Sequence, residues 1–133
     1  MLRKYGYTLF FAGWMILITV LSLVSFSSLD SPKLDIPYID KVVHFSFYCV
    51  STFLGCLFLR ELTGGKIKMS KGIFLMVFVL VLYGMIIEVV QEAFTDERSM
   101  EFSDALANTL GAITGGVIIN YLFSGKRQLK WKI

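Results

Sequence analysis

Charged residues are missing from long stretches of this sequence, and their absence decides the fold class. Four segments are predominantly apolar: 7–26, 42–59, 73–94 and 105–123. The second contains only His44 as an ionisable base, the third contains only Glu88 and Glu92, and the other two contain no charge. A helix needs about 20 residues, within a range of roughly 17 to 25, to cross the hydrocarbon core. We therefore predict an all-α membrane protein, a four-helix transmembrane bundle that forms one domain over residues 1–133.

The residues that mark familiar sites are also scarce. The chain has two cysteines and a single histidine. Cys49 and Cys56 lie seven residues apart in one predicted helix, which separates them by about 10 Å along its axis, too far for a disulfide. A glycine-rich phosphate loop and a serine–histidine–aspartate set in a recognisable context are both missing. The sequence therefore indicates no familiar class of enzyme and leaves any cofactor unknown.

Two alternatives to four retained helices fit the sequence poorly. The apolar run of the first segment is too long for a signal peptide, whose core spans roughly 7 to 15 residues. None of the four segments alternates polar with apolar residues, as the strands of a membrane barrel do. The all-helical prediction therefore stands for every segment.

The basic residues are distributed unevenly around the four segments. Ten of the 13 lysines and arginines precede the first, separate the second from the third, or follow the fourth. By the positive-inside rule this predicts that both termini are cytoplasmic. Each basic stretch is short and next to the membrane, so we expect contacts with lipid headgroups and none with nucleic acid.

Polar residues in three of the predicted helices fall at one depth. His44, Glu88 and Asn108 each lie roughly 6 to 10 Å below the outer membrane boundary, at 1.5 Å of rise per residue. On each helix, neighbours three or four residues away extend a polar face: Asp40 and Tyr48 beside His44, Gln91 and Glu92 beside Glu88, Asp104 beside Asn108. A polar face turned toward lipid would cost several kcal/mol. We therefore expect the three faces to turn toward one another.

The predicted result is a polar pocket open to the outside. Asp40, Lys41, Arg98 and Asp104 would form its rim, and His44 with Glu88 its floor. Tyr48, Gln91, Glu92 and Asn108 complete the expected ligand-binding set. Carboxylates outnumber bases in this group, and crowded, partly desolvated carboxylates are often functional, although a buried network can also be purely structural.

Two kinds of chemistry suit these residues. His44 and Glu88 could act as a general acid and base, and the planar fork of Arg98 could hold a phosphate or carboxylate. A mixed metal site from Asp40, His44, Glu88 and Glu92 is conceivable. With one histidine available, we predict that no metal is bound.

Small features indicate how the helices end and pack. Asp40 and Ser103 are placed to cap the second and fourth helices, and Gly64-Gly65 predicts a turn between the second and third. Gly111 and Gly115, four residues apart, form a close-packing motif. We expect the partner of this stripe to be the second or third helix, with a homodimer or another membrane protein as the competing use.

The ordered set of polar residues resembles a known family. Asp40-Lys41-x-x-His44, then Glu88-x-x-Gln91, then Arg98, Asp104, Asn108 and Gly111 look like the VanZ-like family of bacterial membrane proteins. The resemblance implies a multi-pass protein of the bacterial cytoplasmic membrane with a role in the cell envelope. The family's name is associated with teicoplanin resistance, and the resemblance supplies no settled reaction.

Three functions remain open from the sequence. The outer pocket could bind the polar, anionic head of a lipid, a lipid-linked wall precursor or a lipoglycopeptide. It could instead belong to an intramembrane enzyme that acts on such a substrate at the outer leaflet through His44 and Glu88. The chain could also be a subunit that enters a larger membrane complex through the glycine stripe.

Overall fold

The computed structural model describes residues 5–23, 38–94, 101–124 and 131. These residues form four α-helices and no strand: α1 (Gly6–Leu23), α2 (Ile39–Leu62), α3 (Met69–Phe94) and α4 (Phe102–Phe123). Each helix is long enough and apolar enough to cross a membrane. The predicted all-α fold class, with four helices able to span a membrane, is confirmed, while the cytoplasmic placing of both termini stays a prediction.

The helices begin one to four residues before the predicted starts. The prediction followed apolar residues only, whereas α2, α3 and α4 each begin with a polar turn that holds Asp40, Ser70 or Ser103. Residues 24–26, which the prediction placed in the first helix, lie outside the described residues.

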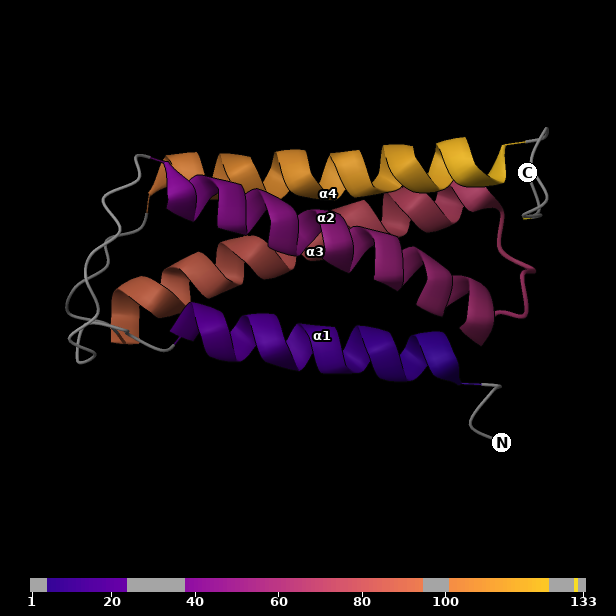
Figure 1. Ribbon diagram of the computed structural model, residues 1–133, viewed down its shortest axis with the longest axis horizontal. Coiled ribbons are helices and arrows are strands. Elements are labelled where there is room, and N and C mark those ends of the chain that lie inside the picture. The colour runs from indigo at the N-terminus through magenta and orange to yellow at the C-terminus, as the bar shows by residue number, and fades with distance from the viewer. Residues whose placement is uncertain (1–4, 24–37, 95–100, 125–130, 132–133) are drawn as a thin grey trace.

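The four helices alternate in direction and form a bundle (Figure 1). α1 and α3 end, and α2 and α4 begin, at one end of the bundle, which we call the polar end. We call the opposite end, where Lys66 and Lys68 separate α2 from α3, the basic end. α2 makes its most extensive contact with α4, while α1 packs on the outside against α2 and α3. α2 is therefore the central helix.

The glycine stripe of α4 faces α2 inside the chain. A Cβ atom on Gly111 would overlap the carbonyl oxygen of Phe45, and one on Gly115 would overlap that of Cys49. The two backbones touch at these points because no side chain separates them. The predicted packing against a neighbouring helix is thus realised with α2. Assembly with a second copy or another protein through α4 stays a prediction, and it would need a different face of the helix.

Several hydroxyl groups within the helices are satisfied locally. Thr19, Ser46, Ser51, Thr109 and Thr114 each donate to the backbone carbonyl oxygen four residues earlier. Lipid offers no hydrogen-bond partner, so a hydroxyl in a membrane helix must find one inside the protein. Two of them also bond another helix, since Ser51 Oγ accepts from Trp14 Nε1 and Thr19 bonds the Tyr83 hydroxyl. Among the described residues, the buried Thr52 hydroxyl has no hydrogen-bond partner.

Both predicted helix caps are wrong. The N-cap position of α2 is Tyr38, whose φ of 66° is left-handed, and the N-cap of α4 is Glu101; neither caps through its side chain. Asp40 and Ser103 lie in the first turns, where Asp40 accepts from Lys41 and Ser103 donates to Glu101. The side chains that were expected to cap the two helices are thus bonded to Lys41 and Glu101 instead. The predicted turn is confirmed, with Gly64 and Gly65 at φ of 59° and 72°.

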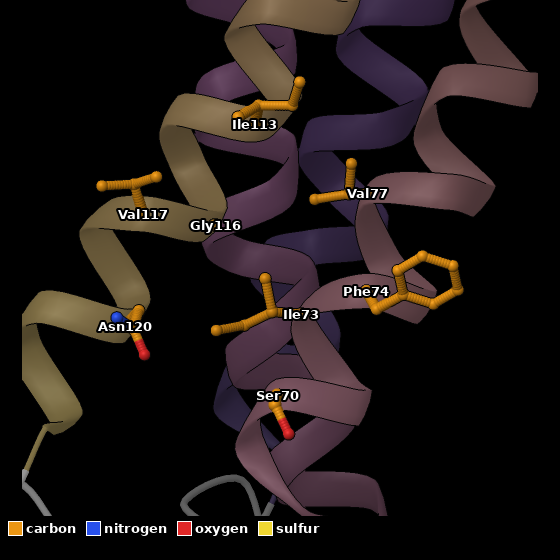
Figure 2. Close-up of a pocket in the computed structure, with 8 residues that line it drawn as sticks. All are labelled: Ser70, Ile73, Phe74, Val77, Ile113, Gly116, Val117 and Asn120. Atoms are coloured by element: carbon orange, nitrogen blue, oxygen red, sulfur yellow. The ribbon is translucent and has the colours of Figure 1, made fainter.

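Two features distinguish the basic end. The Trp131 side chain is buried, donates from Nε1 to the carbonyl oxygen of Ile67 at 2.9 Å, and packs edge-on against Phe123. Between α3 and α4, a groove of about 420 Å³ opens on the side of the bundle (Figure 2).

Both cysteines are free, as predicted.

We expect Gly111→Ala to lower the free energy of unfolding by about 1–3 kcal/mol, because its methyl group would push α4 away from the Phe45 carbonyl. Gly13→Ala is the matched control, since a Cβ there meets nothing within 4 Å and alanine favours a helix. Thermal unfolding of the purified variants in one detergent measures both. Equal melting temperatures for Gly111→Ala and the wild type would contradict the close packing.

Candidate functional site

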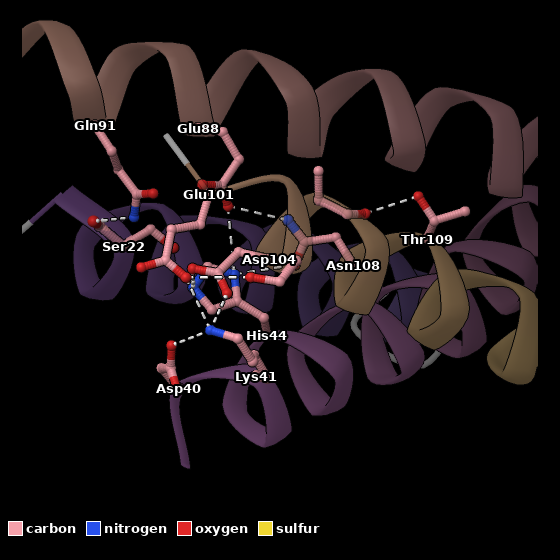
Figure 3. Close-up of polar contacts among 12 residues, drawn as sticks. Ser22, Asp40, Lys41, His44, Glu88, Gln91, Glu101, Asp104, Asn108 and Thr109 are labelled. Carbon is pink, nitrogen blue, oxygen red and sulfur yellow. Dashed lines mark hydrogen bonds and ion pairs between the residues drawn. The ribbon is translucent and has the colours of Figure 1, made fainter. Parts of the chain in front are cut away.

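Lys41 is the centre of the charged contacts at the polar end. Its Nζ lies 2.7 Å from Asp40 Oδ2, 3.0 Å from Glu101 Oε2 and 3.0 Å from Asp104 Oδ1 (Figure 3). All three N–H bonds of the ammonium therefore have a carboxylate acceptor. Asp104 belongs to α4, and Glu101 is the residue directly before α4. Lys41, in the first turn of α2, therefore connects the start of α2 with the start of α4.

Glu101 is a member of this site that the sequence prediction missed. It lies just before α4 and outside the apolar run on which the prediction was based. Its spacing of three from Asp104 was the available signal, because residues three apart near a helix start can reach one partner. The hydrogen bond from Lys41 lowers the pKa of the exposed Glu101 carboxyl, and the Ser103 hydroxyl adds to the effect. Glu101 therefore stays ionised, and bonded to Lys41, below the pH at which a free glutamate would protonate.

A chain of buried polar groups lies directly beneath Lys41. The His44 ring contacts Asn108 through Nδ1 and Oδ1 at 3.0 Å, and Asn108 Nδ2 donates to Glu88 Oε1 at 3.3 Å. Asn108 is 1% exposed and Glu88 is 2% exposed. One residue from each of α2, α4 and α3 thus meets at a single depth, in the arrangement that the sequence predicted.

The imidazole of His44 also lies between two carboxylates. Its Nδ1 is 3.6 Å from Glu88 Oε1, and its Nε2 is 4.0 Å from Asp104 Oδ2. Asp104 in turn bonds Lys41 through its other oxygen. The charged contacts and the buried chain therefore form one connected network, with Asp104 and His44 as its link.

The remaining predicted residues lie in different places. Gln91 is buried but turns to α1, where its Nε2 donates to the Ser22 carbonyl oxygen at 2.6 Å. Tyr48 is buried below the network, beside Tyr83 and against Gly84. Glu92 is exposed, so the structure does not bring it to the shared centre as expected. Arg98 lies outside the described residues.

Three members of the network could supply metal ligands. His44, Glu88 and Asp104 each offer one donor atom, and the three atoms lie within 4.8 Å of one another. One nitrogen with two carboxylate oxygens would suit a divalent ion such as zinc or manganese. Asp104 already accepts from Lys41, so an ion would compete with that ammonium. The sequence prediction that no metal binds stays a prediction.

Comparison with known families assigns the chain. A family model described as VanZ/LLP1 matches residues 4–124, nearly its whole length. The chain belongs to the VanZ/LLP1 family. This confirms the resemblance noted in the sequence, while no curated protein and no solved structure gives a significant match. In this VanZ/LLP1 chain, the matched region contains all four helices and every residue of the polar network.

We expect Asn108→Leu to destabilise the bundle by about 1–3 kcal/mol, because it removes the amide that bonds both His44 and Glu88 in a buried place. Asn120→Leu is the matched control, since Asn120 lies on an exposed face of the same helix. Melting temperatures in detergent compare the two. If both substitutions have the same small effect, the amide does not hold the layer together.

Proposed function

We propose that this chain is a cell-envelope protein of the bacterial cytoplasmic membrane whose polar end binds the head of a lipid-like molecule. The ligand class is a lipid, a lipid-linked wall precursor or a lipoglycopeptide. The observation that carries the proposal is the position of Lys41, whose ammonium lies near the end of the bundle among three carboxylates, above a buried polar chain. Charged groups so close to the apolar part of a membrane helix are typical of functional sites.

The distribution of charge supports an outward-facing polar end. Lys66, Lys68 and Lys71 lie at the basic end, and the sequence places further lysines and arginines before α1 and after α4. The positive-inside rule puts that end in the cytoplasm. The polar network would then lie among the headgroups of the outer leaflet.

The contacts indicate how a head could bind. A phosphate or carboxylate would take the place of Glu101 or Asp104 at Lys41, in a charge-assisted hydrogen bond. The displaced carboxylate could accept hydrogen bonds from hydroxyl or amino groups of the same head. Arg98 is our second candidate for contact with the anionic part of the ligand, from its place in the sequence between α3 and α4.

Native mass spectrometry of protein gently extracted from bacterial membranes tests this proposal. We expect the wild type to retain a lipid-like ligand and Lys41→Met to retain at least tenfold less, because the anion loses its ammonium partner. Lys41→Arg, which keeps the positive charge at the same position, is the matched control. Equal retention by both folded variants would contradict headgroup binding at Lys41, and the mass of a ligand lost from Lys41→Met and from Arg98→Ala would give its class.

A second candidate is an enzyme that acts on the same kind of ligand. The observation behind it is that the His44 imidazole lies close to two carboxylates, 3.6 Å from Glu88 and 4.0 Å from Asp104, so that groups able to give and take a proton are gathered at one point. Such an enzyme would use His44 and Glu88 as acid and base, while Lys41 holds the anionic part of the substrate.

Glu88→Gln distinguishes the enzyme from the binding protein, because it keeps the size of the side chain and removes its charge. An enzyme should still load its ligand but lose about 10²- to 10⁴-fold in turnover, whereas a binding protein should change only in affinity. The measurement is the mass of the bound ligand over time in membrane lipid extract. If Glu88→Gln and His44→Ala both leave ligand, products and teicoplanin susceptibility of the cells unchanged, the network is structural.

A further inference from the structure

We infer that the groove between α3 and α4 at the basic end binds one acyl chain of an anionic phospholipid. This site is separate from the polar network and lies at the opposite end of the bundle. The groove has a volume of about 420 Å³, within the range of roughly 300–1,000 Å³ that ligand sites occupy.

The lining of the groove is apolar along its length and polar at one end. Ile73, Phe74 and Val77 of α3 line it on one side, and Ile113 and Val117 of α4 line it on the other (Figure 2). From Ser70 to Val77 the helix rises about 10 Å, which is roughly a third of the 30 Å hydrocarbon core. The groove therefore matches the part of an acyl chain closest to its headgroup.

The polar end of the groove lies at the level where a headgroup would be. Ser70 and Asn120 line it there, one from each helix, at the end nearer the start of α3 (Figure 2). Gly116 contributes no side chain to the floor, where a Cβ would come within 2.8 Å of Ile73 Cγ2. The depth of the groove thus depends on this glycine.

Positive charge around the polar end of the groove determines which headgroup charge is preferred. Lys66, Lys68 and Lys71 are exposed, and none of them forms an ion pair within the described part of the chain. The first turn of α3 contains no acidic residue, so its N-terminus also favours an anion. Lys71 follows Ser70 directly and lies three residues before Phe74, on the flank of the groove. This end therefore prefers an anionic headgroup to a zwitterionic one.

The same charges argue against a second copy of the chain in the groove. Two copies in one membrane share their orientation, and a closed dimer places the same surface of each copy in the interface. The lysines of both copies would then face each other. A lipid with a negative head removes that repulsion instead.

The experiment compares phosphatidylglycerol with phosphatidylcholine of identical chains, mixed equally in nanodiscs that contain the full chain. Native mass spectrometry after mild release counts the lipids that remain bound. We expect the wild type to retain phosphatidylglycerol several-fold more than phosphatidylcholine. Lys71→Glu should reduce that preference at least roughly fivefold, while Lys71→Arg should preserve it.

Filling the groove tests the acyl-chain contact. Val77→Phe should lower bound phosphatidylglycerol at least fivefold, whereas Val79→Phe, on an exposed face of α3 outside the groove, should not. If Val77→Phe does not fold, Val117→Trp takes its place, with Val89→Trp, at a similarly exposed position outside the groove, as control. Lys41→Met should leave this lipid bound, so the result is independent of the proposed headgroup site.

Three results would overturn the inference. The first is equal retention of the two lipids by the wild type. The second is wild-type retention of phosphatidylglycerol by a folded Val77→Phe or Val117→Trp variant. The third is a dimer that excludes the lipid and dissociates when the groove is filled.

Discussion

The arrangement of the bundle depends on satisfying one buried carboxylate inside a membrane helix. Glu88 is 2% exposed, and it can reach the amide of Asn108 only if α3 and α4 are aligned to within about one residue. His44 adds the same constraint for α2, because its ring contacts both Asn108 and Glu88. A shift of any of these helices along its axis would leave a polar group unpaired in lipid. The polar layer therefore fixes the register of three helices at once.

The glycine stripe makes this layer possible. Gly111 follows Asn108 by three residues, so the close approach to α2 and the buried amide lie on one face of α4. Contact with the Phe45 carbonyl brings the start of α4 against the start of α2, and Lys41 can then reach Asp104 and Glu101. The contacts of Lys41 at the polar end thus follow from the close packing of α4 on α2, which lies about one helical turn further into the bundle.

The sequence predicted most of what depends on periodicity and depth. The apolar runs marked the four spans, and the equal depths of His44, Glu88 and Asn108 were enough to predict that they meet. What depends on the packing of a particular neighbour could not be predicted. Gln91 contacts the Ser22 carbonyl because α1 lies against α3, and Glu92 falls outside the buried face because that face is narrower than the polar stripe.

The groove was also beyond prediction, for a different reason. Its lining residues are ordinary apolar positions of two membrane helices, and each has the pattern of a lipid-facing surface. The space arises from how the side chains of α3 and α4 pack around Gly116, where Ile73 and Val77 of α3 come close to the α4 backbone. A space of this kind leaves no pattern in a single sequence, because it depends on how the side chains of two helices pack against each other.

The lysines at the two ends of the bundle differ in whether they already have carboxylate partners. This difference affects which ligands each end can bind. At the basic end the described lysines have no carboxylate partner, so an anion meets no competitor. At the polar end Lys41 is already bonded to three carboxylates, and an anion must displace one of them. If the displaced group is Asp104, it remains near His44 and needs a new hydrogen-bond donor. A ligand with only a phosphate would leave that carboxylate unsatisfied, whereas one that also carries hydroxyl or amino groups can satisfy it. If the polar end binds a headgroup as we propose, it should select heads that combine an anion with donors, as sugar- or peptide-bearing lipids do, over simple phospholipids.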